Sequence, residues 1–303
     1  PGHPDTLASG DLFLYSPFGL AAFEPGGRGP GERALVCVGG LTDGLLSLRY
    51  LPALAEAARA AGWRVVQPVL SSSYRGWGVG SLDEDCQELD VLLRFLADRR
   101  GVRQVAILGS STGCQDAVRY LARGAEARRV VALVLQAPVS DREARLVDST
   151  PEKEQAVQRC RAQAAALIAA GRGQEAMPRE ANPLLGPPDH PVSAYRFDSL
   201  TGRLTDDDMF SSDLTEEELV GKLGHVAVPT LLVGSADDEY VPSWVDMPGL
   251  LGRLSSAMAS GQAGENEVVI IKEGGHGLSS GDAPGQLSAA VARFLARLPP
   301  PPP

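Results

Sequence analysis

The sequence predicts an α/β fold, a mostly parallel central sheet with helices on both faces and an inserted cap. Apolar runs of strand length alternate with amphipathic helical patterns through most of the 303 residues, as expected for parallel strands joined by crossover helices. The alternation stops at about residue 139 and resumes at about residue 226, which indicates an insertion. A chain of this length can bury a large core as one domain that carries such an insertion.

The expected elements follow one another in a regular order. Two short strands open the chain around a turn at Pro17 and Gly19, and the later strands are apolar throughout, which is typical of strands buried on both faces. Strands are expected at residues 11–16, 21–24, 34–38, 64–70, 105–108, 130–136, 230–233 and 267–271. Helices are expected at residues 48–61, 82–98, 114–123, 152–170, 242–260 and 284–298.

The insertion divides the chain into parts. Residues 1–138 and 226–298 are expected to form the core, residues 139–225 the cap or lid, and residues 299–303 a proline tail. We expect the cap to lie over the site, because loops beyond the carboxyl ends of parallel strands hold binding groups in such folds. The alternative is a long solvated excursion without a role.

Composition argues against several classes of function. The formal net charge of −10 and the pI of about 5.0 are unfavourable for a nucleic-acid partner, since phosphates require a basic surface. No apolar run of about 18 residues could span a membrane, and no secretory signal pattern opens the chain, so a cytoplasmic location is expected. The four cysteines lie far apart without a Cys/His cluster, which predicts free thiols and no metal site. The oligomeric state does not follow from the sequence.

The pattern G-x-S-x-G at residues 109–113 is the clearest chemical feature. It directly follows the apolar strand at 105–108 and precedes the helical pattern at 114–123, which is the context that a nucleophile elbow requires. A serine on such a tight turn projects its hydroxyl above the sheet edge, and the flanking glycines let the backbone turn. Ser111 is therefore the candidate nucleophile.

A histidine and an aspartate follow Ser111 in the chain order of the α/β-hydrolase fold, which is Ser, then Asp or Glu, then His. His276 comes after the strand at 267–271, and an imidazole can take the serine proton and return it to the leaving group. Two adjacent aspartates follow the preceding strand. We expect Asp238 to be the acid, because a proline that opens the next helix follows it closely, and Asp237 is the alternative.

The glycine-rich segment at 39–44 follows the strand at 34–38, where this fold has its oxyanion loop. The backbone amides of Leu41 and Thr112 are expected to stabilise the oxyanion of the tetrahedral intermediate. A phosphate-binding loop fits less well, because no Lys-Ser/Thr pair follows and the G-x-G-x-x-G spacing is absent.

The serine-rich loop at 71–80 also follows a strand and carries large side chains. Tyr74 and Trp77 could form a wall that binds substrate. An aromatic plug against the core is the alternative, because pocket walls and core plugs use the same residue types.

Motifs along nearly the whole chain share the pattern of one known family. They lie at residues 39–46, 71–78, 81–82, 85, 111–113, 115–116, 195–197, 199–200, 207–214 and 238–242. With these motifs the chain resembles an α/β-hydrolase family, long classed as of unknown function, that includes the fungal fusarinine-type siderophore esterase. The resemblance implies the α/β-hydrolase fold and a catalytic triad at Ser111, Asp238 and His276.

These observations predict a serine hydrolase without a cofactor, an esterase that cleaves a small-molecule ester through an acyl-enzyme. The resemblance implies siderophore-type esters as substrates, and the aspartates at 206–208 could then attract a cationic ester from a distance. Capping a helix or solvating the lid is the alternative role of these aspartates. The alternative function for the whole chain is a non-catalytic ligand-binding or scaffold protein that retains the fold.

Overall fold

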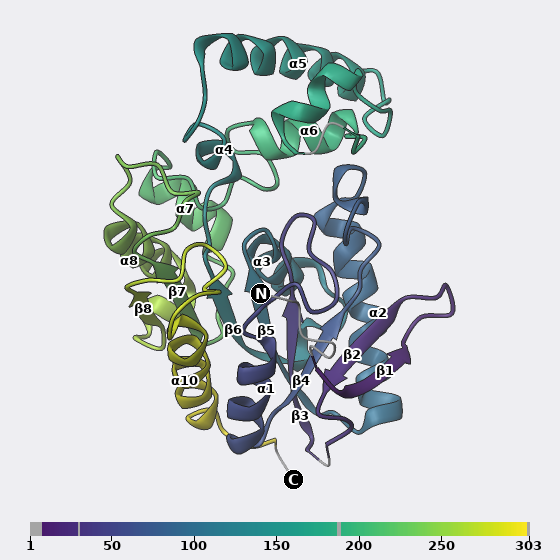
Figure 1. The fold of residues 1–303 in the computed structure, drawn as a ribbon, viewed down its shortest axis with the longest axis vertical. Coiled ribbons are helices and arrows are strands. Elements are labelled where there is room, and N and C mark those ends of the chain that lie inside the picture. The colour runs from purple at the N-terminus through teal and green to yellow at the C-terminus, as the bar shows by residue number, and fades with distance from the viewer. Residues whose placement is uncertain (1–7, 30, 187–188, 302–303) are drawn as a thin grey trace.

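The computed structural model describes residues 8–29, 31–186 and 189–301. Residues 1–7 and 30 of the expected core, 187–188 of the expected cap and 302–303 of the proline tail lie outside the described residues. Within them, eight strands form one sheet in the order β1-β2-β4-β3-β5-β6-β7-β8 (Figure 1). The strands are β1 (Gly10–Leu14), β2 (Ala21–Pro25), β3 (Arg33–Val38), β4 (Arg64–Pro68), β5 (Gln104–Ser110), β6 (Val130–Gln136), β7 (Thr230–Ser235) and β8 (Glu267–Ile271). β1 pairs with β2 and β2 with β4 in antiparallel fashion, and the remaining pairs are parallel, which confirms the predicted sheet.

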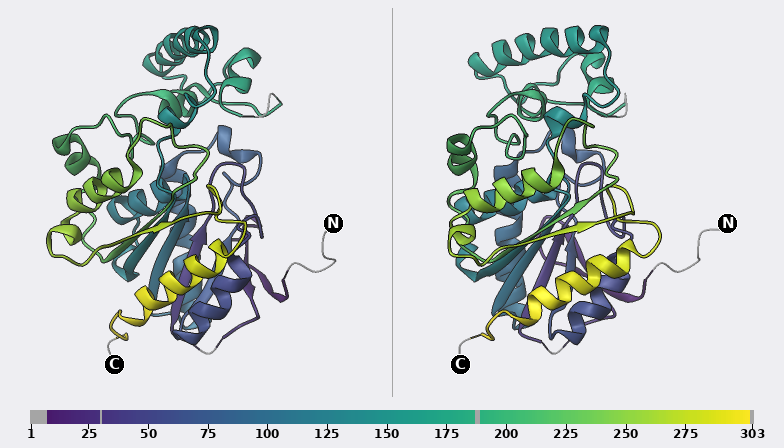
Figure 2. Two further views of the ribbon diagram at one scale, coloured as in Figure 1. Left: turned by 60° about the vertical axis from the view of Figure 1, so that its left-hand side comes forward. Right: turned by 90° about the vertical axis from the view of Figure 1, so that its left-hand side faces the viewer.

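Helices cover both faces of this sheet (Figures 1 and 2). One face carries α1 (Leu51–Ala60) and α10 (Ala283–Ala296) side by side, and the other carries α2 (Leu82–Arg100), α3 (Gly113–Arg123) and α8 (Met247–Ala257). The other α-helices are α4 (Asp141–Ala144), α5 (Pro151–Ala169), α6 (Ala194–Thr201), α7 (Glu216–Leu223) and α9 (Ala259–Gln262). Short 3-10 helices are η1 (Gly76–Gly78), η2 (Ala127–Arg129) and η3 (Arg179–Leu184).

Successive residues of the central strands point to opposite faces, as the pleat of a strand requires. In β3, Leu35 belongs to the hydrophobic cluster beneath α1 and α10, whereas Val36 belongs to the cluster beneath α2 and α3. Both side chains are completely buried. Strands buried on both faces are continuous apolar runs in the sequence, which is why the expected strands agree closely with those of the structure.

The expected insertion contains two structurally different parts. Helices α4, α5 and α6 lie beyond the sheet, at the top of Figure 1, and α5 packs on α6. This helical part has its own hydrophobic cluster, which includes Phe197, Leu200 and, from the core, Trp77. The later part, from Met209 through α7, packs instead into the core cluster beside α8.

Three short helices, α4, α6 and α7, are absent from the sequence prediction. Each begins after a hydroxyl residue whose side chain accepts a hydrogen bond from the first turn: Ser140, Ser193 and Thr215. At α7 the carboxylate of Glu218 accepts the reciprocal bond from the amide of Thr215, which completes a capping box. These capping signals were present in the sequence, but the proline, glycine and aspartate around them obscured the short helical segments.

The helix expected at 242–260 is also shorter in the structure. It begins at Met247, because the side chain of Asp246 accepts a hydrogen bond from the amide of Gly249 and caps the helix there. It ends before Met258, whose backbone is extended and separates α8 from α9.

Two expectations from composition can be compared with the fold. The four cysteines Cys37, Cys86, Cys114 and Cys160 are free thiols, as predicted, and the structure shows that all four are buried. Among the described residues, no helix combines the length and the apolar character needed to cross a bilayer.

Candidate active site

The candidate nucleophile Ser111 lies on a sharp turn between β5 and α3. Its φ angle is 54°, in the left-handed region that residues with a side chain seldom occupy. Its amide donates a 2.9 Å hydrogen bond to the main-chain oxygen of Gln136 on the neighbouring strand β6, which holds the turn in place. The strand, strained turn and helix form the geometry of a nucleophile elbow.

Both glycines of the G-x-S-x-G pattern are required by close backbone approach. A Cβ atom on Gly109 would lie 2.2 Å from the carbonyl oxygen of Gly113. A Cβ atom on Gly113 would lie 2.4 Å from the carbonyl oxygen of Val38, at the end of β3. The small residues therefore bring the elbow against the loop that follows β3.

That loop is the expected oxyanion loop, and it lies directly against Ser111. A Cβ atom on Gly40 would be 2.7 Å from Cβ of Ser111 and 3.2 Å from its Oγ. The amide of Gly40 donates a 2.7 Å hydrogen bond to Oδ2 of Asp43, which holds the loop in a tight turn. In the described part of the chain, the amides of Leu41 and Thr112 donate no backbone hydrogen bond outside helices and strands.

His276 lies on the loop after β8 and contacts the second of the two candidate acids. Its Nδ1 lies 3.0 Å and 2.9 Å from the two carboxylate oxygens of Asp238, whose side chain is only 1% exposed. Asp237 points elsewhere: its Oδ1 accepts hydrogen bonds from the hydroxyl of Ser235 at 2.6 Å and from the amide of Gly275 at 3.0 Å. These two bonds, the hydroxyl first, lower the pKa of Asp237.

The two residues after Asp238 contact the same histidine. Oε2 of Glu239 accepts a 2.7 Å hydrogen bond from the amide of His276. The ring of Tyr240 packs edge-on against the imidazole, with ring centres 4.7 Å apart. Three consecutive carboxylates thus hold the histidine loop, each at a different group.

Ser111 and His276 open into one cavity of about 590 Å³. The core contributes the oxyanion loop, Ser47, Arg49, Tyr240 and Ser279 to its walls. The expected cap contributes Val139, Asp141, Ala144, Arg145, Leu184, Leu185, Gly186 and Leu200. Residues between 139 and 200 therefore supply most of the apolar wall of this cavity.

Tyr74 and Trp77, the expected substrate wall, do not line this cavity. The hydroxyl of Tyr74 accepts a 2.9 Å hydrogen bond from the amide of Leu45, so this residue supports the end of the oxyanion loop. Trp77 is 2% exposed, packs in the hydrophobic cluster of the cap, and donates from Nε1 to Nδ1 of His190 at 3.2 Å. Trp77 is therefore a buried plug, as in the alternative, but it packs in the cluster of the expected cap and not against the core.

The aspartates at 206–208 cannot all attract a cationic ester from a distance or solvate the lid, because two of the three are buried. Asp207 is 2% exposed and Asp208 is 4% exposed. Asp207 forms a buried ion pair of 2.6 Å with Arg196, a residue of α6. Only Asp206 remains partly exposed, and it accepts a 2.6 Å hydrogen bond from the hydroxyl of Tyr195. Charges paired in the interior cannot steer a substrate from a distance.

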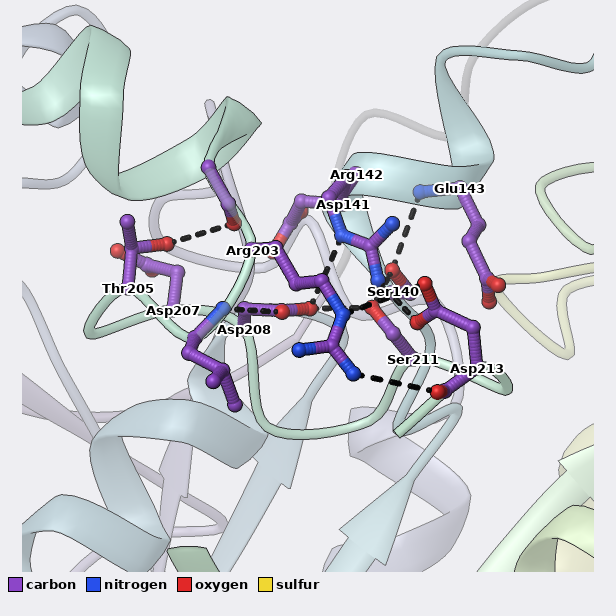
Figure 3. Close-up of polar contacts among 12 residues, drawn as sticks. Ser140, Asp141, Arg142, Glu143, Arg203, Thr205, Asp207, Asp208, Ser211 and Asp213 are labelled. Atoms are coloured by element: carbon purple, nitrogen blue, oxygen red, sulfur yellow. Dashed lines mark hydrogen bonds and ion pairs between the residues drawn. The ribbon is translucent and has the colours of Figure 1, made fainter. Parts of the chain in front are cut away.

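Asp208 bonds to residues of both chain segments that connect the expected cap with the core (Figure 3). Its carboxylate pairs with Nε of Arg142 at 3.4 Å and accepts from the amide of Leu204 at 2.7 Å and from the hydroxyl of Ser211. Arg142 also pairs with Asp213. The segment that leaves β6 and the segment that returns to the core are therefore bonded to one another.

A group of buried and partly buried carboxyls lies between the elbow helix and the expected cap. Burial raises the pKa of Asp85 to about 6, and burial together with Asp85 raises the pKa of Asp116 well above its ordinary value. Asp141, in the cavity wall, is bonded by Nε2 of Gln115 at 2.7 Å, and burial reinforced by Asp207 raises its pKa to about 7. The guanidinium of Arg196 is the principal cation near all of them.

Three residues near the site did not emerge from the sequence. Gln136 is the polar last residue of an otherwise apolar strand, and this position at a carboxyl end was the available signal. Tyr240 and Asp141 follow strands β7 and β6 by a few residues, but only the folded chain shows that they reach the cavity.

Comparison with known proteins identifies the family of this chain. Residues 7–298 match the model of a family described as a protein of unknown function, DUF1749. The chain belongs to this family. It is 32% identical over 312 residues to the fusarinine C esterase SidJ of Aspergillus fumigatus, an alignment that covers 88% of each chain. It is 30% identical to an Emericella nidulans protein named as an esterase, with 84% of this chain and 81% of that protein covered. The predicted resemblance is confirmed.

Solved structures lead to the same fold. The siderophore hydrolase EstB from Aspergillus fumigatus superposes with a TM-score of 0.77 at 30% identity, covering 97% of this chain and 98% of the other. An α/β-hydrolase fold protein of unknown function has a TM-score of 0.68 at 22% identity, covering 98% of this chain and 97% of the other. The DUF1749 chain therefore has the α/β-hydrolase fold, as predicted.

Proposed function

We propose that this protein is a serine esterase that cleaves a small-molecule ester through an acyl-enzyme. The observation that carries the proposal is the strained turn at Ser111, which opens into the same cavity as a histidine bonded to a buried aspartate. Backbone strain of this kind persists where the surrounding structure maintains it, and it is concentrated at functional sites. The names of the related esterases support the same class of reaction.

In the first step Ser111 Oγ attacks the ester carbonyl while His276 takes the hydroxyl proton. With the Nδ1 proton directed at Asp238, the other ring nitrogen, Nε2, is the basic atom. The Asp238 carboxylate then stabilises the imidazolium, and the imidazolium returns the proton to the departing alcohol. Water attacks the acyl-enzyme by the same route and releases the acid.

The oxyanion of each tetrahedral intermediate is assigned to the amides of Leu41 and Thr112. The contact between Gly40 and Ser111 brings the Leu41 loop to the nucleophile, and Thr112 is the residue directly after it. Fixed amides that point at the developing charge can contribute several kcal/mol to the barrier reduction, about 2.7–4 kcal/mol for one donor.

The substrate proposal rests on the relatives and on the cavity. SidJ is named a fusarinine C esterase and EstB a siderophore hydrolase, which directs the proposal to siderophore-type esters. A cavity of about 590 Å³ lies within the range typical of small-molecule sites. Most of its apolar wall comes from residues 139–225, so we assign substrate selection to this cap.

A fluorophosphonate probe tests the proposal. The wild-type protein is expected to become covalently labelled, and Ser111→Ala to remain unlabelled. Ser279→Ala, at another serine of the same cavity, is the matched control and should label like the wild type. Folded wild-type protein that does not react would favour the non-catalytic alternative. A panel of short acyl, lipid, thiol and hydroxamate-siderophore esters then identifies the substrate class.

A further inference from the structure

Gln136 is a buried polar residue that connects the two halves of the candidate active site. It is the last residue of β6, it lies opposite Ser110 in the parallel pairing with β5, and it is completely buried. It is not among the residues that line the cavity. A completely buried amide must satisfy its hydrogen-bonding groups within the protein, so its partners define its role.

The acceptor side of Gln136 holds the nucleophile turn. Its main-chain oxygen accepts the 2.9 Å hydrogen bond from the amide of Ser111. Its side-chain Oε1 accepts from the hydroxyl of Ser110 at 2.6 Å and from the hydroxyl of Tyr50 at 3.2 Å. These bonds fix the residue immediately before the nucleophile as well as the nucleophile itself.

The donor side of Gln136 holds the histidine loop. Its Nε2 donates a 2.8 Å hydrogen bond to the main-chain oxygen of His276. The amide of the same residue is bonded to Glu239, so both peptide groups beside the imidazole are held. A single planar amide, about 3 Å from each neighbour, therefore sets how far the histidine loop lies from the elbow.

We propose that Gln136 is a positioning residue that sets the distance between Ser111 and His276. The inference rests on the proposed function, since it concerns the alignment of that nucleophile and that base. Glutamine suits the position because one side chain both accepts from two hydroxyls and donates to a carbonyl oxygen. An ionised glutamate keeps the acceptors but loses the donor, and methionine, of similar length, loses both.

The expected consequence is a loss of kcat without a change of KM. Gln136→Met should lower kcat by about 10²-fold, because a misplacement of about 1 Å at reacting groups costs this much. KM should stay within about twofold, because Gln136 does not contact the cavity. The matched control is Gln104→Met. Gln104 is a buried glutamine at the start of β5, so it lies at the amino ends of the parallel strands, and its substitution should keep the wild-type kcat.

The pH dependence of Gln136→Glu distinguishes positioning from a merely structural role. A protonated glutamic acid has an O–H donor for the His276 carbonyl oxygen and an acceptor for the two hydroxyls, so it reproduces the amide. Burial favours that neutral form. The ratio of the variant kcat/KM to the wild-type value should therefore rise at least about tenfold between about pH 8 and about pH 5, whereas the ratio for Gln136→Met should not change.

Each protein is measured well below its own Tm, on an ester that the wild type hydrolyses. A folded Gln136→Met protein with the wild-type kcat, or with a raised KM and an unchanged kcat, would overturn the inference. If Gln136→Met does not fold, the Gln136→Glu ratio decides: a ratio that still lies far below one at about pH 5 overturns the inference, and a ratio that reaches about one at that pH supports it. Failure of the proposed function is a separate result, because it would appear as wild-type protein without Ser111-dependent labelling.

Discussion

The imidazole of His276 is bonded through Nδ1 to both carboxylate oxygens of Asp238, at 3.0 and 2.9 Å. Asp237, one residue earlier, bonds the amide of Gly275 instead. Two adjacent aspartates therefore hold one loop in different ways, since one contacts the imidazole and the other contacts the backbone. This difference leads to a direct comparison of variants.

Asp238→Asn should lower kcat by about 10⁴-fold, because an amide neither enforces the tautomer with its proton on Nδ1 nor stabilises the imidazolium. Asp237→Asn should lower kcat by less than about tenfold, since it removes only a hydrogen bond that supports the backbone of the histidine loop. Steady-state kinetics of the two variants, with melting temperatures to show that both fold, provide the comparison. The reverse ranking would assign the acid to Asp237.

Gly40→Ala should lower kcat by about 10²–10³-fold, the cost of losing one oxyanion donor. The added methyl group would lie 2.7 Å from Cβ of Ser111, so either the nucleophile or the oxyanion loop must shift. Gly252→Ala in α8 is the control, because its Cβ would meet no atom within 4 Å. Equal kcat values for the two variants would argue against close contact between this loop and Ser111.

Arg196→Met should destabilise the fold by about 3–5 kcal/mol, because the carboxylate of Asp207 would remain buried without its partner. The exposed pair of Arg75 and Asp189, whose side chains are 63% and 65% exposed, is the control. Arg75→Met should lower the free energy of unfolding by less than about 1 kcal/mol. Urea unfolding measures both, and equal losses would contradict the buried ion pair.

Asp116→Asn should change how stability depends on pH. Since burial and Asp85 raise the pKa of Asp116, the folded protein keeps a proton there at pH values where the unfolded chain has lost it. This carboxyl therefore contributes stability that falls as pH rises from about 4 towards the folded pKa, with a slope of up to about 1.4 kcal/mol per pH unit. The variant should lose this slope and be more stable than the wild type at pH 7. Urea unfolding from about pH 4 to about pH 7 measures the slope, and an unchanged slope would show that Asp116 is ionised in the folded protein.

The core strands and the places of the candidate site residues in the fold could be predicted from the sequence, because most of their signals are local. Strands such as β6, expected at the same residues as observed, are apolar runs, and the elbow at Ser111 is set by neighbouring glycines. His276 follows from chain order and from its place after β8. The strand and elbow predictions each depend on residues within one short window, and the prediction of His276 adds the order of the three residues along the chain.

The polar interior could not be predicted, because its pairs are distant in sequence. Asp208 belongs to an acidic run that suggests a solvated surface, yet its partner Arg142 is 66 residues away. The bond between Gln136 and the oxygen of His276 joins residues 140 positions apart. Nothing in either segment alone shows that a charge is neutralised or that an amide is shared.

The measurement that tests the central claim most directly is the turnover of Ser111→Ala on an ester that the wild-type protein hydrolyses, beside Ser279→Ala as the control. If Ser111 is the nucleophile, kcat falls by about 10⁶-fold while the melting temperature and the binding of the ester stay close to the wild type. Ser279→Ala should retain its activity. A folded Ser111→Ala protein that hydrolyses the ester at the wild-type rate would contradict the proposal.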